Sequence, residues 1–281
     1  MYQFNYKGHE DAPGVPIITS ENAEEVAANG CARSTVKETY EFILGDLNKA
    51  IELLANTKKT RSDKRYVSLD VAYGIRARVH LTMHNYADAL KDAEAALAST
   101  SSVPYSSAAV SKPTFIDIED ASWMWGILIT DKDRVSTTGI CNFPSHMGSL
   151  NYGYASVGGW RRISPKLYNQ IPESDVRKGW FLDDTGVSVN LPAAAQAYIT
   201  KKGAPVYTQV KYGPMNDEWG SNNNATDVIL MRVEEMYLIK AEAQAMNNDV
   251  SGGVNTLNSF VNTYRDPSYK CTATTGEAVQ E

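Results

Sequence analysis

The chain has 281 residues, of which 43% are hydrophobic, enough to bury a substantial core. Its formal net charge of −6 argues against a nucleic-acid binder, which needs a basic surface to neutralise phosphates. No apolar run approaches the ~20 residues of a membrane-spanning helix, and the start lacks the basic and then apolar pattern of a secretion signal, so the sequence fits either a cytoplasmic protein or a trimmed piece of an exported one.

The N-terminal third of the chain predicts three helices after an extended start of about thirty residues. Ser34 is a suitable N-cap for a helix over residues 34–55, whose apolar residues recur at steps of three and four. A helix over residues 69–84 follows a polar segment. A short break at Asn85 then separates it from a helix over residues 86–97.

Two predicted helix pairs, this first one and a second over residues 227–246 and 252–264, share a spacing of residues that are small except for Phe260. Within each pair the steps are twelve and then seven positions, the spacing of small residues in a tetratricopeptide helix pair. They join Ala77, Ala89 and Ala96 in the first pair and Ala241, Gly253 and Phe260 in the second. Because the pairs lie 164 positions apart, they do not form a contiguous solenoid with a repeat of ~34 residues.

The segment between the pairs, about residues 100–226, is rich in Ser, Gly, Pro and Asn and predicts only two short helices, over 164–170 and 173–181. It also holds all five tryptophans: Trp123, Trp125, Trp160, Trp180 and Trp219. The predicted fold is therefore all-α, a single domain over residues 1–281. Its tetratricopeptide-like scaffold spans about 34–98 and 227–264, and a large loop-rich, Trp-rich insertion supplies the place for a binding site.

An aromatic, glycine-rich stretch over residues 151–162 is the best functional lead within the insertion. Sugars present flat C–H faces and rings of hydroxyls, so aromatic platforms beside planar hydrogen-bonding groups suit them. The residues expected to bind a glycan are Asn151, Tyr152, Tyr154, Trp160 and Arg161, together with Trp125. The alternative, that these rings pack the insertion onto the helices, stays open.

The remaining groups of histidines, acidic residues and cysteines do not indicate a catalytic or metal-binding site. His80 and His84 stand four apart on a predicted helix, but no third metal ligand is evident and two helix-surface histidines are expected. Asp183 and Asp184, or the acidic residues over 117–120, would suit glycoside hydrolysis only at a set separation that sequence does not give. They are expected to be solvated surface charges. Without a catalytic pattern, the sequence predicts no enzyme, no metal and no cofactor. The three cysteines, Cys31, Cys141 and Cys271, are expected to be buried free thiols.

Four stretches of this chain resemble the SusD/RagB family of surface glycan-binding lipoproteins of Bacteroidetes. They are Gly-Val-Pro-Ile-Ile-Thr over 14–19, Val-Lys-Glu-Thr-Tyr over 36–40 with Asp-Leu-Asn-Lys-Ala over 46–50, Asp-Val-Arg over 175–177, and Met-Arg-Val-Glu-Glu-Met-Tyr-Leu-Ile over 231–239 with Ala-Glu-Ala over 241–243. Their order fits the family along nearly the whole chain, although Glu234 stands where the family usually has a small apolar residue.

The resemblance implies capture of oligosaccharides at the extracellular face of the outer membrane and delivery to a SusC-like TonB-dependent transporter. It also implies a lipid anchor as the only membrane contact. Because the family's lipidated start and a helix after its end are missing, this chain looks like the middle of a longer protein. The alternative prediction is a tetratricopeptide module that binds peptide tails, for which contiguous repeats lined with Lys, Arg and Asn would be expected.

Overall fold

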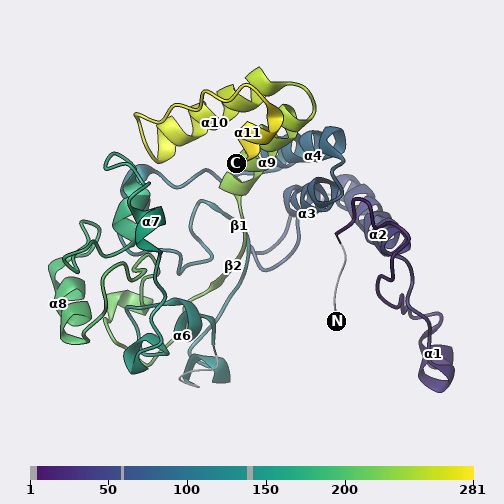
Figure 1. Ribbon diagram of the computed structural model, residues 1–281. Helices are drawn as coiled ribbons and strands as arrows, with labels where there is room; N and C mark the ends of the chain where they lie inside the picture. The colour runs from purple at the N-terminus through teal and green to yellow at the C-terminus, as the bar shows by residue number, and fades with distance from the viewer. Residues whose placement is uncertain (1–4, 58–59, 138–141) are drawn as a thin grey trace.

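The computed structural model describes residues 5–57, 60–137 and 142–281 of the chain, which are mostly helical (Figure 1). The helices are α1 (Ala23–Asn29), α2 (Val36–Asn56), α3 (Leu69–Thr82), α4 (Tyr86–Ser99), α5 (Ser107–Val110), α6 (Phe143–Met147), α7 (Pro165–Tyr168), α8 (Ala193–Lys201), α9 (Val233–Met246), α10 (Val250–Tyr264) and α11 (Gly276–Gln280). The strands β1 (Trp123–Ile127) and β2 (Val228–Arg232) form an antiparallel pair.

The long N-terminal helix begins one residue later than the sequence predicts. Thr35, rather than Ser34, is the N-cap of α2: its side chain accepts from the backbone N–H of Glu38, whose carboxylate accepts from the N–H of Thr35. This reciprocal capping box satisfies two backbone donors at the helix start, which Ser34 could not do without an acidic residue three positions on. The start of the chain also holds a short helix, α1, where an extended segment was expected.

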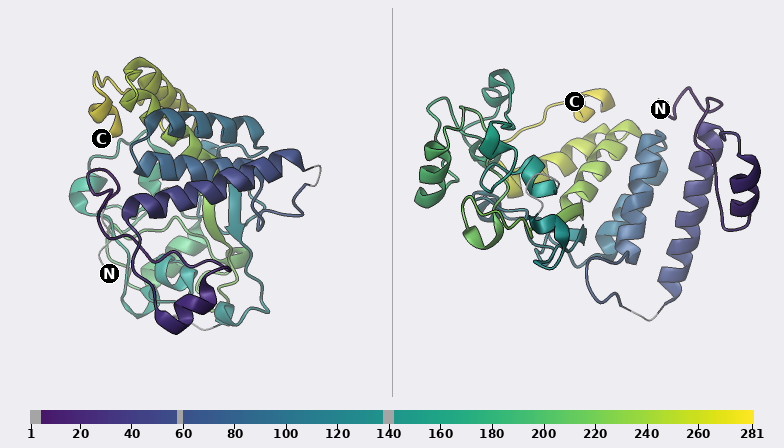
Figure 2. Two further views of the ribbon diagram at one scale, coloured as in Figure 1. Left: turned by 90° about the vertical axis from the view of Figure 1, so that its right-hand side faces the viewer. Right: turned by 90° about the horizontal axis from the view of Figure 1, so that it is seen from below.

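Helices α3, α4, α9 and α10 pack side by side and bury their small residues (Figures 1 and 2). Ala77, Ala89 and Ala96 have no exposed surface. In the second pair the backbones approach so closely that a Cβ added to Gly253 would lie 2.6 Å from the carbonyl oxygen of Ala241. Ala77, Ala89, Ala96, Ala241 and Gly253 are thus buried among these packed helices.

Residues 228–232, predicted to begin the helix that follows them, form a strand instead. In β2, Val228 pairs with Ile127 and Arg232 with Trp123, and α9 begins directly afterwards at Val233. The prediction was wrong because a short apolar run fits a strand or a buried helix equally well, and the deciding partner strand lies far away in sequence. The helix predicted over 173–181 is likewise only a 3-10 helix, Val176–Trp180.

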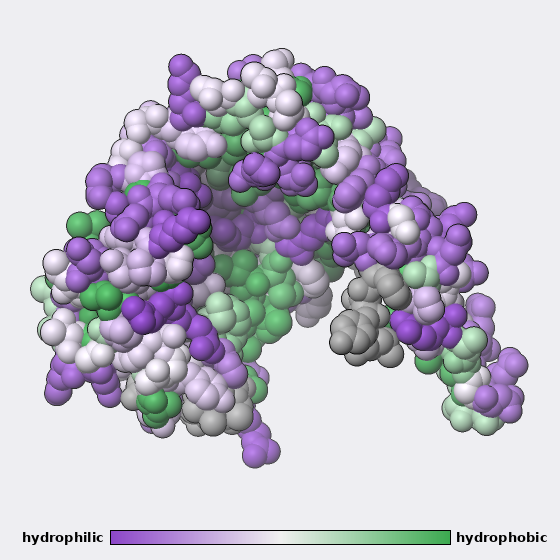
Figure 3. All heavy atoms as spheres, viewed as in Figure 1, coloured by the Kyte–Doolittle hydropathy of each residue, from purple (hydrophilic) through white to green (hydrophobic). Residues whose placement is uncertain are grey.

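The segments between β1 and β2 form a lobe with α6, α7 and α8 on one side of the packed helices, while α1 and α2 lie on the other (Figures 1 and 2). The whole is an arch, and the space-filling view shows a hydrophobic patch on its inner surface below a hydrophilic region (Figure 3). The lobe has its own buried cluster, made by Leu150, Leu182, Ile199 and Val210. Within the described residues, no helix is both long and apolar enough to cross a bilayer.

The cysteines differ from the buried thiols expected. Cys31 is exposed and Cys271 partly exposed, because neither lies on an inward face of a helix. Cys141 lies outside the described residues.

Candidate functional site

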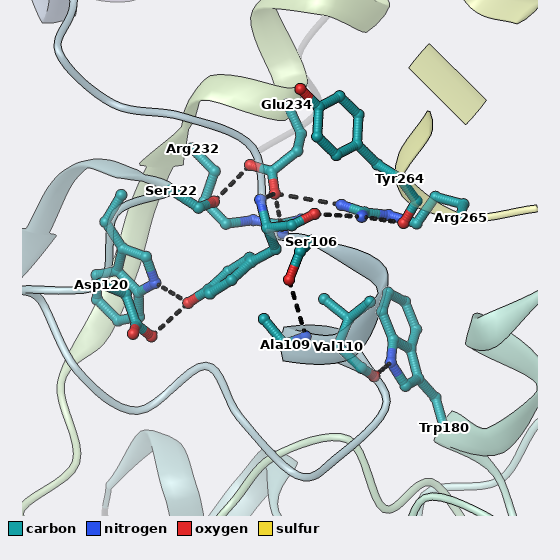
Figure 4. Close-up of polar contacts among 12 residues, drawn as sticks. Ser106, Ala109, Val110, Asp120, Ser122, Trp180, Arg232, Glu234, Tyr264 and Arg265 are labelled. Carbon is teal, nitrogen blue, oxygen red and sulfur yellow. Dashed lines mark hydrogen bonds and ion pairs between the residues drawn. The ribbon is translucent and has the colours of Figure 1, made fainter. Parts of the chain in front are cut away.

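A buried ion pair joins the start of α9 to the segment between α4 and β1 (Figure 4). The carboxylate of Glu234 accepts hydrogen bonds from the backbone N–H of Tyr105 at 2.9 Å, from the Ser122 hydroxyl at 2.5 Å and from the Arg265 guanidinium at 3.2 Å. Arg265 also donates to the backbone carbonyls of Tyr105 and Tyr264. Glu234 and Arg265 are almost fully buried, so this pair fixes the segment that leads into the lobe.

The side chain of Tyr105 continues this connection toward the surface. Its hydroxyl accepts from the indole N–H of Trp123 at 2.7 Å and donates to the carboxylate of Asp120. Burial, reinforced by the hydrogen bond to Asp120, raises the pKa of Tyr105, so the phenol keeps its proton. Burial also raises the pKa of Asp120. The protonated hydroxyl of Tyr105 therefore holds the Asp120 carboxylate in place through a hydrogen bond.

Asp120 lines a cavity of about 640 Å³ on the lobe, a volume typical of small-molecule sites (~300–1,000 Å³). One wall comes from residues 112–120 and the other from residues 189–192 and from Asp217 and Trp219. The lining brings together an indole ring, the carboxylates of Asp117, Asp120 and Asp217, and the ammonium of Lys112. This mixture of one flat apolar surface and several hydrogen-bonding groups suits a polyhydroxylated ligand.

The backbone directly after Trp219 turns at a glycine. Gly220 has φ +83°, a conformation that L residues rarely adopt, and a Cβ there would lie 2.5 Å from the ring of Tyr198. Its N–H donates to the carbonyl of Leu150 at 2.8 Å. Trp219 itself packs against the lobe cluster that includes Leu150 and also lines the cavity.

The structure brings part of the predicted aromatic stretch next to Trp219. Trp160 is partly buried and packs on the same lobe cluster as Trp219. The N–H of Tyr152 donates to the carbonyl of Ser221 at 2.8 Å, and its side chain is 40% exposed. The ring of Tyr154 contacts that of His146 at a centroid distance of 4.8 Å.

The remaining predicted residues are placed differently. Asn151 is buried and donates its side-chain N–H to the amide oxygen of Asn224. Arg161 is exposed, with a long hydrogen bond of 3.4 Å to the carbonyl of Gly159. Trp125 lies on β1, packs against the helices and donates to the carbonyl of Arg65 at 3.2 Å. The site proposed from sequence is therefore dispersed. Trp160 shares the lobe cluster with Trp219, and Tyr152 is hydrogen-bonded to Ser221, two residues after Trp219.

The cavity as a group of residues was missed by sequence reasoning. Residues 112–120 and Trp219 lie about a hundred positions apart, and no periodic pattern links two loops that meet only in the folded chain. The available signals were the tryptophan itself and the acidic run over 117–120, which was interpreted as solvated surface charge. Asp120 corrects that interpretation, because its carboxyl is partly buried and hydrogen-bonded.

His80 and His84 were both expected on the surface of a helix. Neither is found there. The side chain of His80 is only 13% exposed and lies 3.8 Å from Asp92, and burial lowers its pKa. His84 lies beyond the end of α3 with φ 61°. In the part of the chain that the structure describes, no three His, Cys, Asp or Glu residues are grouped to hold a metal ion.

Comparison with known proteins gives one consistent set of relatives. Residues 1–81 match a SusD-like family model described as "Starch-binding associating with outer membrane". The chain is 25% identical to SusD-like protein P2 of Formosa agariphila, with 91% of this chain and 51% of that protein covered. The chain thus spans about half the length of this relative.

Solved structures agree with this over nearly the whole chain. A SusD-like carbohydrate binding protein from Bacteroides vulgatus superposes with a TM-score of 0.73 and 25% identity, covering 99% of this chain and 54% of that one. Surface glycan-binding protein A from Bacteroides thetaiotaomicron has the same fold, with a TM-score of 0.58 at 15% identity over 88% of this chain and 57% of that one.

Proposed function

The chain belongs to the SusD-like family, and from that premise we propose that it captures oligosaccharides at the outer-membrane surface without altering them. The observation that carries the proposal is the cavity beside Trp219, where an indole ring and several polar side chains converge. Delivery of the captured glycan to a SusC-like TonB-dependent transporter belongs to the same proposal, and it is supported by the family relation.

The chemistry of the cavity supports capture of a sugar. A pyranose ring can stack its C–H face on the Trp219 indole, and an aromatic side chain loses little conformational entropy when it binds. Carboxylates accept hydrogen bonds from sugar hydroxyls, and the Lys112 ammonium donates one. Similar proteins carry names that describe binding, as in the carbohydrate binding protein of Bacteroides vulgatus.

Replacing Trp219 by Ala is expected to weaken glycan binding about 10-fold, or 1.4 kcal/mol, because the stacking surface is lost. A glycan array identifies ligands of the unaltered protein, and calorimetric titration then measures each variant. Thermal melts must accompany the titration, because the indole also packs on the lobe cluster. Chromatography of the incubated glycans should show no shortened products.

Two further tryptophans serve as controls for this experiment. Trp125→Ala removes an indole on β1, away from the cavity lining, and should leave affinity unchanged. Trp160→Ala tests whether the aromatic stretch predicted from sequence belongs to the site. If Trp125→Ala loses binding while Trp219→Ala keeps it, the site lies elsewhere on the molecule. Release of shorter oligosaccharides would contradict capture without turnover.

The charge of the cavity predicts a preference for neutral glycans. Three carboxylates against one ammonium repel a uronic acid or a sulfated sugar, and this repulsion weakens as salt is added. We expect oligogalacturonides and sulfated oligosaccharides to bind about 10-fold more weakly than neutral chains at low salt. Asp217→Asn removes one of these carboxylates and should therefore reduce the difference in affinity between neutral and acidic chains. Asp217 is exposed, so the substitution should not disturb the fold.

Titration of neutral and acidic oligosaccharides at two salt concentrations checks this preference. Asp46→Asn, an exposed carboxylate on α2, removes the same charge far from the cavity and should leave the gap unchanged. Tighter binding of acidic chains would show that the lining carboxylates do not face the ligand.

A further inference from the structure

A second depression of about 310 Å³ adjoins the cavity beside Trp219. Val189 and Asn190 line both, and the opposite wall passes from one to the other through consecutive residues, Ser111 in the second depression and Lys112 in the first. The two depressions therefore adjoin at Val189 and Asn190, which form the ridge between them.

Of the two ridge residues, Asn190 is held by hydrogen bonds inside the protein, and Val189 is exposed to solvent. Asn190 is buried, and its side-chain amide donates to the backbone carbonyls of Val176 at 3.2 Å and Val110 at 3.5 Å. These contacts join the two walls beneath the surface. Val189, by contrast, is 91% exposed, so it offers a small apolar surface at the point where the depressions join.

The second depression repeats the mixture of groups found in the first. It is lined by the rings of Tyr168 and Phe181 and by the side chains of Glu173 and Lys178. Lys178 forms an ion pair with Glu173, and its ammonium lies 5.1 Å from the centroid of the Tyr168 ring. Aromatic surface and charged hydrogen-bonding groups thus stand on both sides of Val189.

We propose that the two depressions are successive subsites for one extended oligosaccharide, which crosses the ridge at Val189. This inference rests on the proposed function and adds to it the length of the ligand. One sugar unit would stack at Trp219, units further along the chain would contact Tyr168 and Phe181, and the C–H face of a linking unit would lie on Val189. Affinity then rises with chain length until both depressions are filled.

Calorimetric titration with malto-, cello-, xylo- and manno-oligosaccharides of two to six units tests this. In the series that binds, the hexasaccharide should bind at least about 10-fold more tightly than the disaccharide. Tyr168→Ala should remove most of that gain and leave disaccharide affinity unchanged. Glu173→Ala, whose side chain is 89% exposed, should reduce the gain without risk to folding. Tyr66→Ala, an exposed tyrosine outside both depressions, is the matched control and should change nothing.

The outcomes separate the two proposals. Affinity that does not depend on chain length, or a length gain that survives both Tyr168→Ala and Glu173→Ala, overturns the second subsite while capture at Trp219 stands. If no series binds, the proposed function fails and the subsite fails with it.

Discussion

Replacing Glu234 by Ala is expected to lower the free energy of unfolding by about 3–5 kcal/mol, because the change leaves the Arg265 guanidinium buried without its counter-charge. The carboxylate is also the acceptor for the Tyr105 N–H and the Ser122 hydroxyl, and both donors would lose their partner away from water. Urea or thermal unfolding of the variant and the unaltered protein measures the difference.

The matched control is a more exposed ion pair that also involves α9. Lys240 on α9 lies 2.9 Å from Glu94 on α4, with the Glu94 side chain 50% exposed. Glu94→Ala should cost no more than about 1 kcal/mol, because water screens such a pair. Equal losses for Glu94→Ala and Glu234→Ala would mean that the buried pair adds no more stability than a surface pair.

Enlarging the small residue at a helix crossing should also destabilise the fold. Ala77 has no exposed surface and belongs to the main buried cluster, so Ala77→Leu has no space for its added carbons and is expected to cost about 1–3 kcal/mol. Ala98 lies on the exposed side of α4, and Ala98→Leu should change stability little. Melting temperatures compare the two variants, and a similar melting temperature for both would contradict the close packing of the pair.

The helices could be predicted where a stripe of apolar residues repeats at the helical period. This holds for α2, α3, α4 and α10, whose ends differ from the prediction by a few residues. The strands could not be predicted, because each is short and its partner is remote in sequence. At the start of α2 the deciding signal was present: Glu38 stands three residues after Thr35 and identifies the cap.

The residues that line the candidate cavity were not predicted as a group from the sequence. The sequence indicated tryptophans in an irregular insertion, and one of them, Trp219, does line a cavity. Asn151 was predicted to bind a glycan, and in the structure it is buried and its side-chain amide donates to Asn224. Contacts between loops depend on the whole chain path, so residue type and local spacing alone could not distinguish a ligand contact from an internal one.

The pairing of β1 with β2 has a consequence for how the chain folds. Ile127 contacts Val228 in this sheet, so the pairing must close a loop of about 100 residues before any of its hydrogen bonds form. Helices α3 and α4 lie next to each other in sequence and can associate much earlier. We therefore expect the sheet and the lobe to assemble in a slow, late step, since non-local contacts lower folding rates. Until then the hydrophobic face of β1 is open to other chains.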